Sequence, residues 1–588
     1  MIGKIIANND NQLKIELTVQ PETLAGLINT HVKIYDDKVI IIGEILNIDK
    51  NIANVNLVGQ IVDNKFVPAV INSPSFSAAV TLIDNNDLQL ILGKSEGVNF
   101  TVGNLPLYNN IELNIGLNGF LSNHFAVFGN TGSGKSCSVS RLIQNMFSTT
   151  EIPYRANIFI FDAYGEYKSA FDTFLENRSP YLKFKALTTN VNHGSDEELL
   201  KIPLWLLNTD DLALLLNATE SSQLEVIKKA NKLVKIFAAN NEIGMKYKND
   251  IIARSILSIL GSGNTPAQIR DQVFAVLTNY NTTEFNLDSK VVLPGYTRSL
   301  RQCFLIDASN KINDIQLITE YIGTFKDETL ENININYEFP YNLNDFRNAL
   351  NFALIAEGIF ESDKVFDYAN ILKVRLDALL SESTKEYFDY NLYVNIDEYM
   401  RDLLFKDGKK AQIINFNISH VDDRLGKSLA KIYSRILFDY ATKLKNRASM
   451  PFHIIVEEAH RYIQNDNDIH LLGYNIFDRI TKEGRKYGVI LGLISQRPSE
   501  LSETAVSQCT NFLILRMYHP KDLSYIKDMV PNISEEIVKK LKTLHPGTCI
   551  AFGSSFSIPF IVKLKMPDPR PTSISCDVEK IWYFDKFQ

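Results

Sequence analysis

The sequence predicts an α/β protein in which a small β-barrel precedes a core of buried parallel strands and a helical segment interrupts that core. Three observations support this fold class. Closely spaced short strands open the chain, compact apolar runs alternate with helical periodicity from His124, and helix-period segments fill residues 195–405. Because 588 residues exceed what one hydrophobic core supports, we expect several domains.

The first domain, residues 1–115, is expected to be an N-terminal β-barrel. Its apolar runs are short and are separated by turns rich in Asn and Asp, as at 4–7, 13–17, 32–35, 39–48 and 53–58. Short strands joined by polar turns are typical of a small barrel, and such a peripheral module more often serves assembly or docking than catalysis.

The core is expected in two parts, residues 116–194 and 406–565. An apolar run at 156–161 ends in Asp162, as a parallel strand buried on both faces would, and similar runs resume after residue 412. The intervening residues 195–405 are expected to form a helical insertion, with helix-period segments at 222–239, 251–260 and 365–380. The proline-rich end, 566–588, is expected to be an extended arm.

The overall composition limits the classes of function. A formal net charge of −7 and a pI near 5.8 exclude a uniformly basic coat, so any nucleic acid must meet a local basic surface. The odd number of cysteines and their wide spacing favour neither a disulfide framework nor a zinc site; they are Cys137, Cys303, Cys509, Cys549 and Cys576. With no apolar run of 18 residues and no leader pattern, we expect a soluble cytoplasmic protein without a membrane partner.

One segment matches the pattern G-x-x-x-x-G-K-[ST] and lies between an apolar run and a helical pattern. Its glycines let backbone N–H groups surround phosphates, Lys135 reaches the β and γ oxygens, and the Ser136 hydroxyl binds Mg²⁺. We therefore expect ATP and Mg²⁺ as cofactors. The expected nucleotide-binding residues are Gly129, Asn130, Thr131, Gly132, Ser133, Gly134, Lys135, Ser136 and Cys137.

A P-loop enzyme also needs an acid at the end of a buried strand to hold Mg²⁺ and a carboxylate to orient the attacking water. The run HIIVEE at 453–458 supplies both acids, although a solvated strand end could have the same pattern. We assign Glu457 to the Mg²⁺ and Glu458 to water activation, and the two roles could be shared. Lys135 and Glu458 are therefore the first two residues that we expect to be catalytic.

Three further residues are candidates on weaker patterns. Gln496 follows the apolar run 489–494, where an amide can contact both the γ-phosphate and the attacking water, although a capped surface strand end is an equal alternative. Arg485, on a Gly-flanked basic turn, could supply a guanidinium to a neighbouring subunit or be simply solvated. His460 is more often a structural residue in such a position, and we leave it off the catalytic set.

Together these motifs resemble the HerA-type ATPases, which are relatives of the FtsK DNA pumps. The resemblance spans almost the whole chain, and the segments after the acidic pair are more specific than the phosphate loop. The segments that carry it are GNTGSGKS at 129–136, FDAYGEY at 161–167, IPLWLLN at 202–208, IVEEAHRYI at 455–463, EGRKYGV at 483–489 and SQRPSEL at 495–501.

The resemblance implies a RecA-like P-loop NTPase core with a HAS-barrel-like N-terminal module, a homohexamer, and duplex DNA pumped through the central pore. It also implies a partner, either a NurA-like nuclease or a sirtuin-type NAD-consuming effector, the latter in bacterial anti-phage defence. Asp162 and Glu166 are implied near the nucleotide, but the family's Pro-His after the Asp is here Ala163-Tyr164. Two hypotheses follow: an ATP-driven DNA translocase, or a hexameric platform whose ATPase cycle gates an effector.

Overall fold

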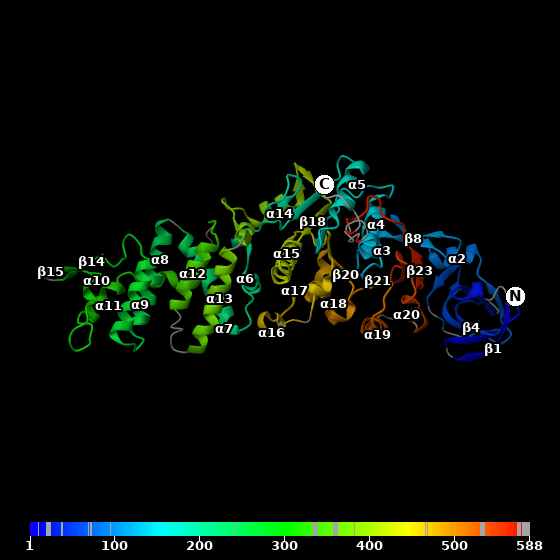
Figure 1. Ribbon diagram of the computed structural model, residues 1–588, viewed down its shortest axis with the longest axis horizontal. Coiled ribbons are helices and arrows are strands. Elements are labelled where there is room, and N and C mark those ends of the chain that lie inside the picture. The colour runs from blue at the N-terminus through cyan, green and yellow to red at the C-terminus, as the bar shows by residue number, and fades with distance from the viewer. Residues whose placement is uncertain are drawn as a thin grey trace.

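The computed structural model describes most of residues 1–588. The residues outside the description are 10, 19–24, 37–38, 69, 71–72, 94–95, 240, 294, 333–338, 357–362, 382, 465, 467, 530–534, 573–577, 579–581 and 583–588. The molecule is elongated: a barrel lies at one end, the helical insertion lies at the other, and the α/β core lies between them (Figure 1). Among the described residues, no helix is both long enough and apolar enough to cross a bilayer.

The N-terminal strands form a closed antiparallel barrel, which confirms the predicted fold of this region. Its strands lie in the order β2-β1-β7-β3-β4-β5-β6, and a further pairing of β2 with β5 closes a ring of six. Burial alternates along β5, because successive side chains of a strand point to opposite faces. The strands are β1 (Gly3–Asn9), β2 (Gln12–Leu17), β3 (His31–Asp36), β4 (Val39–Asp49), β5 (Ile52–Val62), β6 (Lys65–Val67) and β7 (Ala79–Leu82), with a 3₁₀ turn η1 (Ala25–Leu27).

The core is a sheet of twelve strands in the order β13-β12-β18-β11-β19-β20-β10-β21-β22-β23-β8-β9. The strands from β13 to β21 are parallel, and those from β22 onward are antiparallel to their neighbours. The strands are β8 (Asn99–Leu105), β9 (Ile111–Gly116), β10 (Phe125–Phe128), β11 (Ile158–Asp162), β12 (Phe184–Thr188), β13 (Glu198–Leu199), β18 (Ile413–Asn417), β19 (Phe452–Val456), β20 (Val489–Ser495), β21 (Asn511–Leu515), β22 (Thr548–Gly553) and β23 (Phe560–Lys563).

Two of these strands differ from the expected domain boundary. The expected boundary at 115 assigned β8 and β9 to the barrel, whereas both belong to the core sheet. The physical reason is that an edge strand pairs wherever an open edge is presented, and β23 offers one. The residues between β7 and β8 form α2 (Asn85–Leu92), which the capping residue Asp84 starts.

Helices cover both faces of the core sheet. Phe125 and Val127 of β10 pack in one hydrophobic cluster with α4 and α5, while Ala126 and Phe128 pack in another with α15 and α17. This split follows from the two-residue period of a strand. The helices are α3 (Leu117–Leu121), α4 (Lys135–Phe147), α5 (Lys168–Arg178), α15 (Asp423–Lys443), α16 (Asp468–Leu472), α17 (Ile476–Glu483), α18 (Glu503–Ser507), α19 (Pro520–Met529) and α20 (Glu535–Leu541), with 3₁₀ turns η6 (Ala459–Arg461), η7 (Gly484–Tyr487) and η8 (Pro498–Glu500).

The expected insertion is mainly helical and projects from the core (Figure 1). Thr265 caps α9 and Pro266 occupies its first turn, so the sequence itself fixes where that helix begins. The elements are η2 (Leu204–Leu206), α6 (Thr209–Leu215), α7 (Ser221–Ala238), α8 (Glu242–Leu260), α9 (Pro266–Asn279), β14 (Lys290–Leu293), β15 (Tyr296–Ser299), α10 (Leu300–Cys303), α11 (Ile315–Gly323), η3 (Glu328–Asn332), α12 (Leu343–Ala356), α13 (Asp363–Ser381), η5 (Ser383–Phe388), α14 (Ile396–Leu404), β16 (Phe405–Lys406) and β17 (Lys409–Lys410).

The described start of the C-terminal segment packs against the core. Gln144 of α4 donates from Nε2 to the Pro569 carbonyl over 2.9 Å, and Ser169 of α5 donates to the Arg570 carbonyl over 2.9 Å. Most of the expected arm beyond Thr572, including Cys576, lies outside the described residues. Cys137, Cys303, Cys509 and Cys549 are free thiols.

Candidate active site

The phosphate loop, residues 129–134, joins the end of β10 to the start of α4. Gly129 donates its N–H to the Ser495 carbonyl over 3.2 Å, which ties the loop to the end of β20. A Cβ at Gly129 would lie 2.6 Å from Ser133 Oγ, so no side chain fits there. Gly134 has a φ of 95°, a left-handed conformation that glycine tolerates. The first-turn N–H groups of α4 therefore open onto a space suited to an anion.

The acidic pair lies beside this loop. Ser136 Oγ donates to Glu457 Oε1 over 3.1 Å, although the two residues are 321 positions apart. The strand order explains the meeting, because β20 separates β10 from β19 and all three are parallel. Their carboxyl ends reach the same edge of the sheet, and the Glu457 N–H donates to the Phe161 carbonyl over 3.1 Å at that edge.

Burial dominates the electrostatics of the site. It raises the pKa of Glu457 well above its usual value, and Asp162, Glu166 and Glu458 raise it further, while the Ser136 hydrogen bond opposes them. Burial also lowers the pKa of Lys135, which the neighbouring Glu458 and Glu457 counteract. Glu457 Oε2 is buried and has no hydrogen-bond partner among the described residues. The site therefore concentrates acids that a bound cation would stabilise.

The donor set fits Mg²⁺. A Ser hydroxyl and a carboxylate oxygen are hard ligands of the kind that Mg²⁺ prefers, and the ion usually takes only one or two carboxylates with phosphates and water. The unpartnered Glu457 Oε2 leaves one such oxygen available. Glu166 lies within reach of the same hydroxyl: burial raises its pKa and a hydrogen bond with Ser136 opposes that rise.

Glu458 is held in an unusual backbone conformation at the start of the loop after β19. Its φ is 46° and its ψ 47°, and it is 6% exposed. Burial raises the pKa of its carboxyl, while Lys135 and the Gln496 N–H oppose that rise. His460 Nδ1 lies 3.3 Å from Glu458 Oε2 and 3.2 Å from Ser495 Oγ. Burial lowers the pKa of His460, and these two distances show that its imidazole contacts the site directly.

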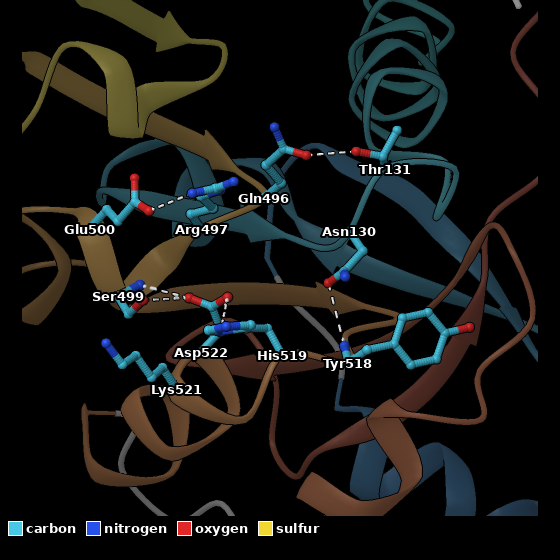
Figure 2. A pocket seen from close by; sticks show the side chains of 10 residues that line it. All are labelled: Asn130, Thr131, Gln496, Arg497, Ser499, Glu500, Tyr518, His519, Lys521 and Asp522. Atoms are coloured by element: carbon cyan, nitrogen blue, oxygen red, sulfur yellow. Dashed lines mark hydrogen bonds and ion pairs between the residues drawn. The ribbon is translucent and has the colours of Figure 1, made fainter.

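Gln496 follows β20 and faces the phosphate loop. Its Oε1 accepts a hydrogen bond from Thr131 Oγ1 over 2.6 Å, and the two side chains, which both line a cavity, point toward one another (Figure 2). The cavity has a volume of about 550 Å³. It is lined by Asn130, Thr131, Gln496, Arg497, Ser499, Glu500, Tyr518, His519, Lys521 and Asp522.

Sequence reasoning missed the four cavity residues that follow β21. Among them, the nearly buried Asp522 accepts from Ser499 Oγ over 2.6 Å, and the Tyr518 N–H donates to Asn130 Oδ1 over 3.4 Å. These residues could have been found from their place after a buried strand. Because β21 is parallel to β10 and pairs with it, the residues that follow β21 lie at the same end of the sheet as the phosphate loop.

Arg485 lies at the amino end of β20, whereas the phosphate loop lies at the carboxyl end of the parallel strands. It is exposed in η7, just before β20 begins, whereas Gln496 follows immediately after β20 ends. Seven strand residues separate these positions by about 20 Å. The structure therefore does not bring Arg485 to the phosphate loop of its own chain.

The carboxylate oxygens of Asp162 are taken up by hydrogen bonds within the protein. Its carboxylate accepts from the N–H groups of Gly165 over 2.7 Å, Glu166 over 3.0 Å and Tyr167 over 3.0 Å. Asn415 Nδ2 also donates to it over 3.1 Å. The Tyr164 N–H donates a fifth bond over 3.3 Å. These five bonds fix the turn after β11 and thereby place Glu166, so Asp162 shapes the site without an oxygen to spare for the nucleotide.

This geometry agrees with the family comparison. Residues 100–291, which include the phosphate loop, match the family described as "Helicase HerA, central domain". The chain therefore carries a HerA-type domain at residues 100–291. The chain is 23% identical to a probable helicase of Methanocaldococcus jannaschii over 82% of its own length and 70% of that protein. It is also 23% identical to a probable DNA double-strand break repair helicase HerA of the same organism, over 88% and 86% of the two chains.

One solved structure similar to this chain is that of the plasmid coupling protein TrwB with a non-hydrolysable GTP analogue. The two are 11% identical over 82% of this chain and 93% of that chain, with a TM-score of 0.45. This overall similarity is too low to carry an inference about function.

Proposed function

We propose that this HerA-type ATPase is a motor that uses ATP hydrolysis to translocate duplex DNA, as a homohexamer in the cytoplasm. The observation that carries the proposal is the Ser136 to Glu457 hydrogen bond of 3.1 Å, which sets a phosphate loop against a buried acidic pair. The relatives named as helicases support DNA as the substrate.

Each site residue has a role in this proposal. The phosphate loop and Lys135 bind the β- and γ-phosphates, and Ser136 and Glu457 hold the Mg²⁺. When bound, that ion neutralises charge on the phosphate oxygens. Glu458 accepts the proton of the attacking water, which its buried position and raised pKa suit.

Two further residues act at the γ-phosphate. Gln496 contacts the γ-phosphate from the Thr131 side of the loop. Arg485 acts in a neighbouring subunit, because its own chain holds it at the far edge of the sheet.

The proposal extends to a partner. A motor of this kind carries out DNA end processing with a NurA-like nuclease, or anti-phage defence with a sirtuin-type NAD-consuming effector. The support is the named activity of the relatives in double-strand break repair.

A second candidate function is a hexameric platform whose ATPase cycle gates such an effector without productive translocation. The net charge of −7 favours it, because an acidic chain repels DNA outside any local basic surface.

The deciding experiment measures ATP turnover with and without duplex DNA at low and at moderate salt. A translocase shows stimulated turnover and salt-sensitive DNA binding, and the Lys135→Ala variant shows no turnover in either condition. Turnover that is normal without DNA, unstimulated by it and accompanied by no DNA binding would reject the translocase in favour of the platform.

A further inference from the structure

A second cavity lies on the α4 face of the core sheet, and one arginine in its wall has no partner within the described part of the chain. The cavity has a volume of about 260 Å³ and lies between α4, the strands β8 and β9 and the segment that follows β23. Its polar wall includes Arg141 and Asn145 of α4, Thr101 of β8, Glu112 of β9 and Lys565.

This cavity is separate from the ATP site and from the surface that carries Arg485. Arg141 and Asn145 stand five and nine residues after Ser136, which places them about 8 and 14 Å farther along the axis of α4. Phe100, which also lines the cavity, belongs to the hydrophobic cluster beneath α4. The helix α17, which leads into the turn of Arg485, packs in the cluster on the other face of the sheet.

The walls of the cavity are held in place by the fold. The pairing of β8 with β9 shifts register between Thr101 and Gly103, which is a bulge in the strand that lies against α4. Asn145 Nδ2 donates to the Thr101 carbonyl over 2.6 Å and ties α4 to this bulge. A Cβ at Gly103 would lie 2.6 Å from the Lys563 carbonyl oxygen, so β8 approaches β23 as closely as only glycine allows. The cavity is therefore a defined part of the structure.

Arg141 is the unusual member of the wall. Its Nε is buried, and the side chain forms neither a hydrogen bond nor an ion pair among the described residues. Leaving a buried guanidinium nitrogen unpaired costs stability, so such a group calls for a partner from outside the chain. The helix end does not explain it, because α4 ends at Phe147 and the benefit of a cation falls off within the last turn.

The other charged groups of the wall do not neutralise Arg141. Glu112 is the one acid among the residues that line the cavity, and its Oε1 accepts from Lys565 Nζ over 3.0 Å. Both of these side chains are about half exposed, at 50% and 55%, so their ion pair stands at the surface. Two cations thus face one acid, and the buried guanidinium carries the excess positive charge.

We propose that this cavity binds a small tetrahedral oxyanion of the phosphate type. A guanidinium presents parallel N–H groups that match two oxygens of such an ion, and Lys565 adds a second positive charge beside it. The volume is below the roughly 300–1,000 Å³ of pockets that enclose larger organic ligands, so the ion fits with water and a nucleotide does not. A bound ion would join α4, the helix that starts at the phosphate loop, to the segment after β23.

The test titrates inorganic phosphate into variants of the full chain by calorimetry at constant ionic strength. Every variant carries Lys135→Ala, which weakens phosphate binding at the phosphate loop. We expect Lys135→Ala to bind phosphate and Lys135→Ala/Arg141→Met to bind it at least about tenfold more weakly, because a charged hydrogen-bonding group is lost. The matched control, Lys135→Ala/Arg155→Met, removes an exposed arginine elsewhere and should bind as tightly as Lys135→Ala. Equal affinity in all three chains, or binding in none, would overturn the inference.

Further arms separate folding from binding and define the ligand. Thermal unfolding in phosphate-free buffer should show Arg141→Met to be no less stable than its parent, because an unpaired buried group is removed. If that variant is destabilised, Lys135→Ala/Lys565→Met decides, with an expected loss of affinity of about twofold to fivefold, and an unchanged affinity overturns the inference. Sulfate should compete with phosphate for the cavity. Acetate that competes equally well would assign the cavity to carboxylates and overturn the phosphate assignment.

Discussion

Ser136 and Glu457 share a hydrogen bond of 3.1 Å that links the helix after the phosphate loop to the acidic end of a strand two places away in the sheet. The carboxylate approaches the hydroxyl with one oxygen and keeps the other unpartnered among the described residues. The pair is therefore arranged as two ligands of one cation, and the predictions below follow from that arrangement.

Replacing Glu458 by Gln should stall hydrolysis and spare ATP binding. The amide keeps the shape of the side chain but cannot accept the proton of the attacking water, so we expect turnover to fall by about 10² to 10⁴. Phosphate release and the binding of a fluorescent nucleotide measure the two properties. Glu503→Gln, at an exposed position of α18, is the control and should behave as wild type. Normal turnover in Glu458→Gln would move the base to Glu457.

Replacing Glu457 by Gln should stabilise the nucleotide-free protein at neutral pH. Folding raises the pKa of this carboxyl well above its usual value of 4.5. Between the pKa of the unfolded chain and the higher pKa of the folded protein, the folded protein therefore binds more protons than the unfolded chain. Stability in the wild type therefore falls as pH rises through that window, and the neutral amide removes this loss. We expect a gain on the order of 1 kcal/mol, measured by urea unfolding at acidic and neutral pH.

The same experiment has a clear contrary result. A Glu457→Gln variant that is less stable than wild type at neutral pH would show that Glu457 makes a net favourable contact. Added Mg²⁺ and ATP should stabilise the wild type more than the variant, because the variant lacks the carboxylate ligand.

Replacing Gln496 by Ala should lower turnover while leaving ATP affinity nearly unchanged. The amide stands at the end of β20 against Thr131, so its loss removes a polar contact at the γ-phosphate rather than at the rest of the nucleotide. We expect a fall in kcat on the order of tenfold to a hundredfold. Gln508→Ala, at an exposed position, serves as control. A matching loss of affinity would instead assign Gln496 to ground-state binding.

Mixing variants should reveal whether Arg485 acts between subunits. Arg485→Ala and Lys135→Ala should each be inactive alone, but mixed rings contain interfaces with an intact loop on one side and an intact arginine on the other. We expect partial recovery of turnover in the mixture. Lys135→Ala mixed with Glu458→Gln is the control, because both residues belong to one chain's site and neither interface becomes complete. Equal inactivity of both mixtures would exclude a role for Arg485 in trans.

The phosphate loop and the acidic pair could be predicted because their chemistry demands particular side chains at the ends of buried strands. Parallel strands carry those ends to one edge, which is why residues as distant as Ser136 and Glu457 meet. The pairing of β8 with β23 could not be predicted, because it depends on which edge the folded sheet leaves open. Asp162 illustrates a further limit: four of its hydrogen bonds come from a turn that the sequence does not specify, and a fifth comes from Asn415 of β18.

The sheet also determines what would happen if the polypeptide were cut. Residues before the helical insertion supply β10 and β11, and residues after it supply β18 to β21. Although β19 and β20 are neighbours, each of these strands is hydrogen-bonded to at least one strand from the other side of the insertion. A protease that cleaved a loop among the inserted helices would produce two fragments. Five hydrogen-bonded pairs of parallel strands, including β12 with β18, would still hold these fragments together. The nicked enzyme would keep both halves of its ATPase centre, and the fragments would separate only on denaturation.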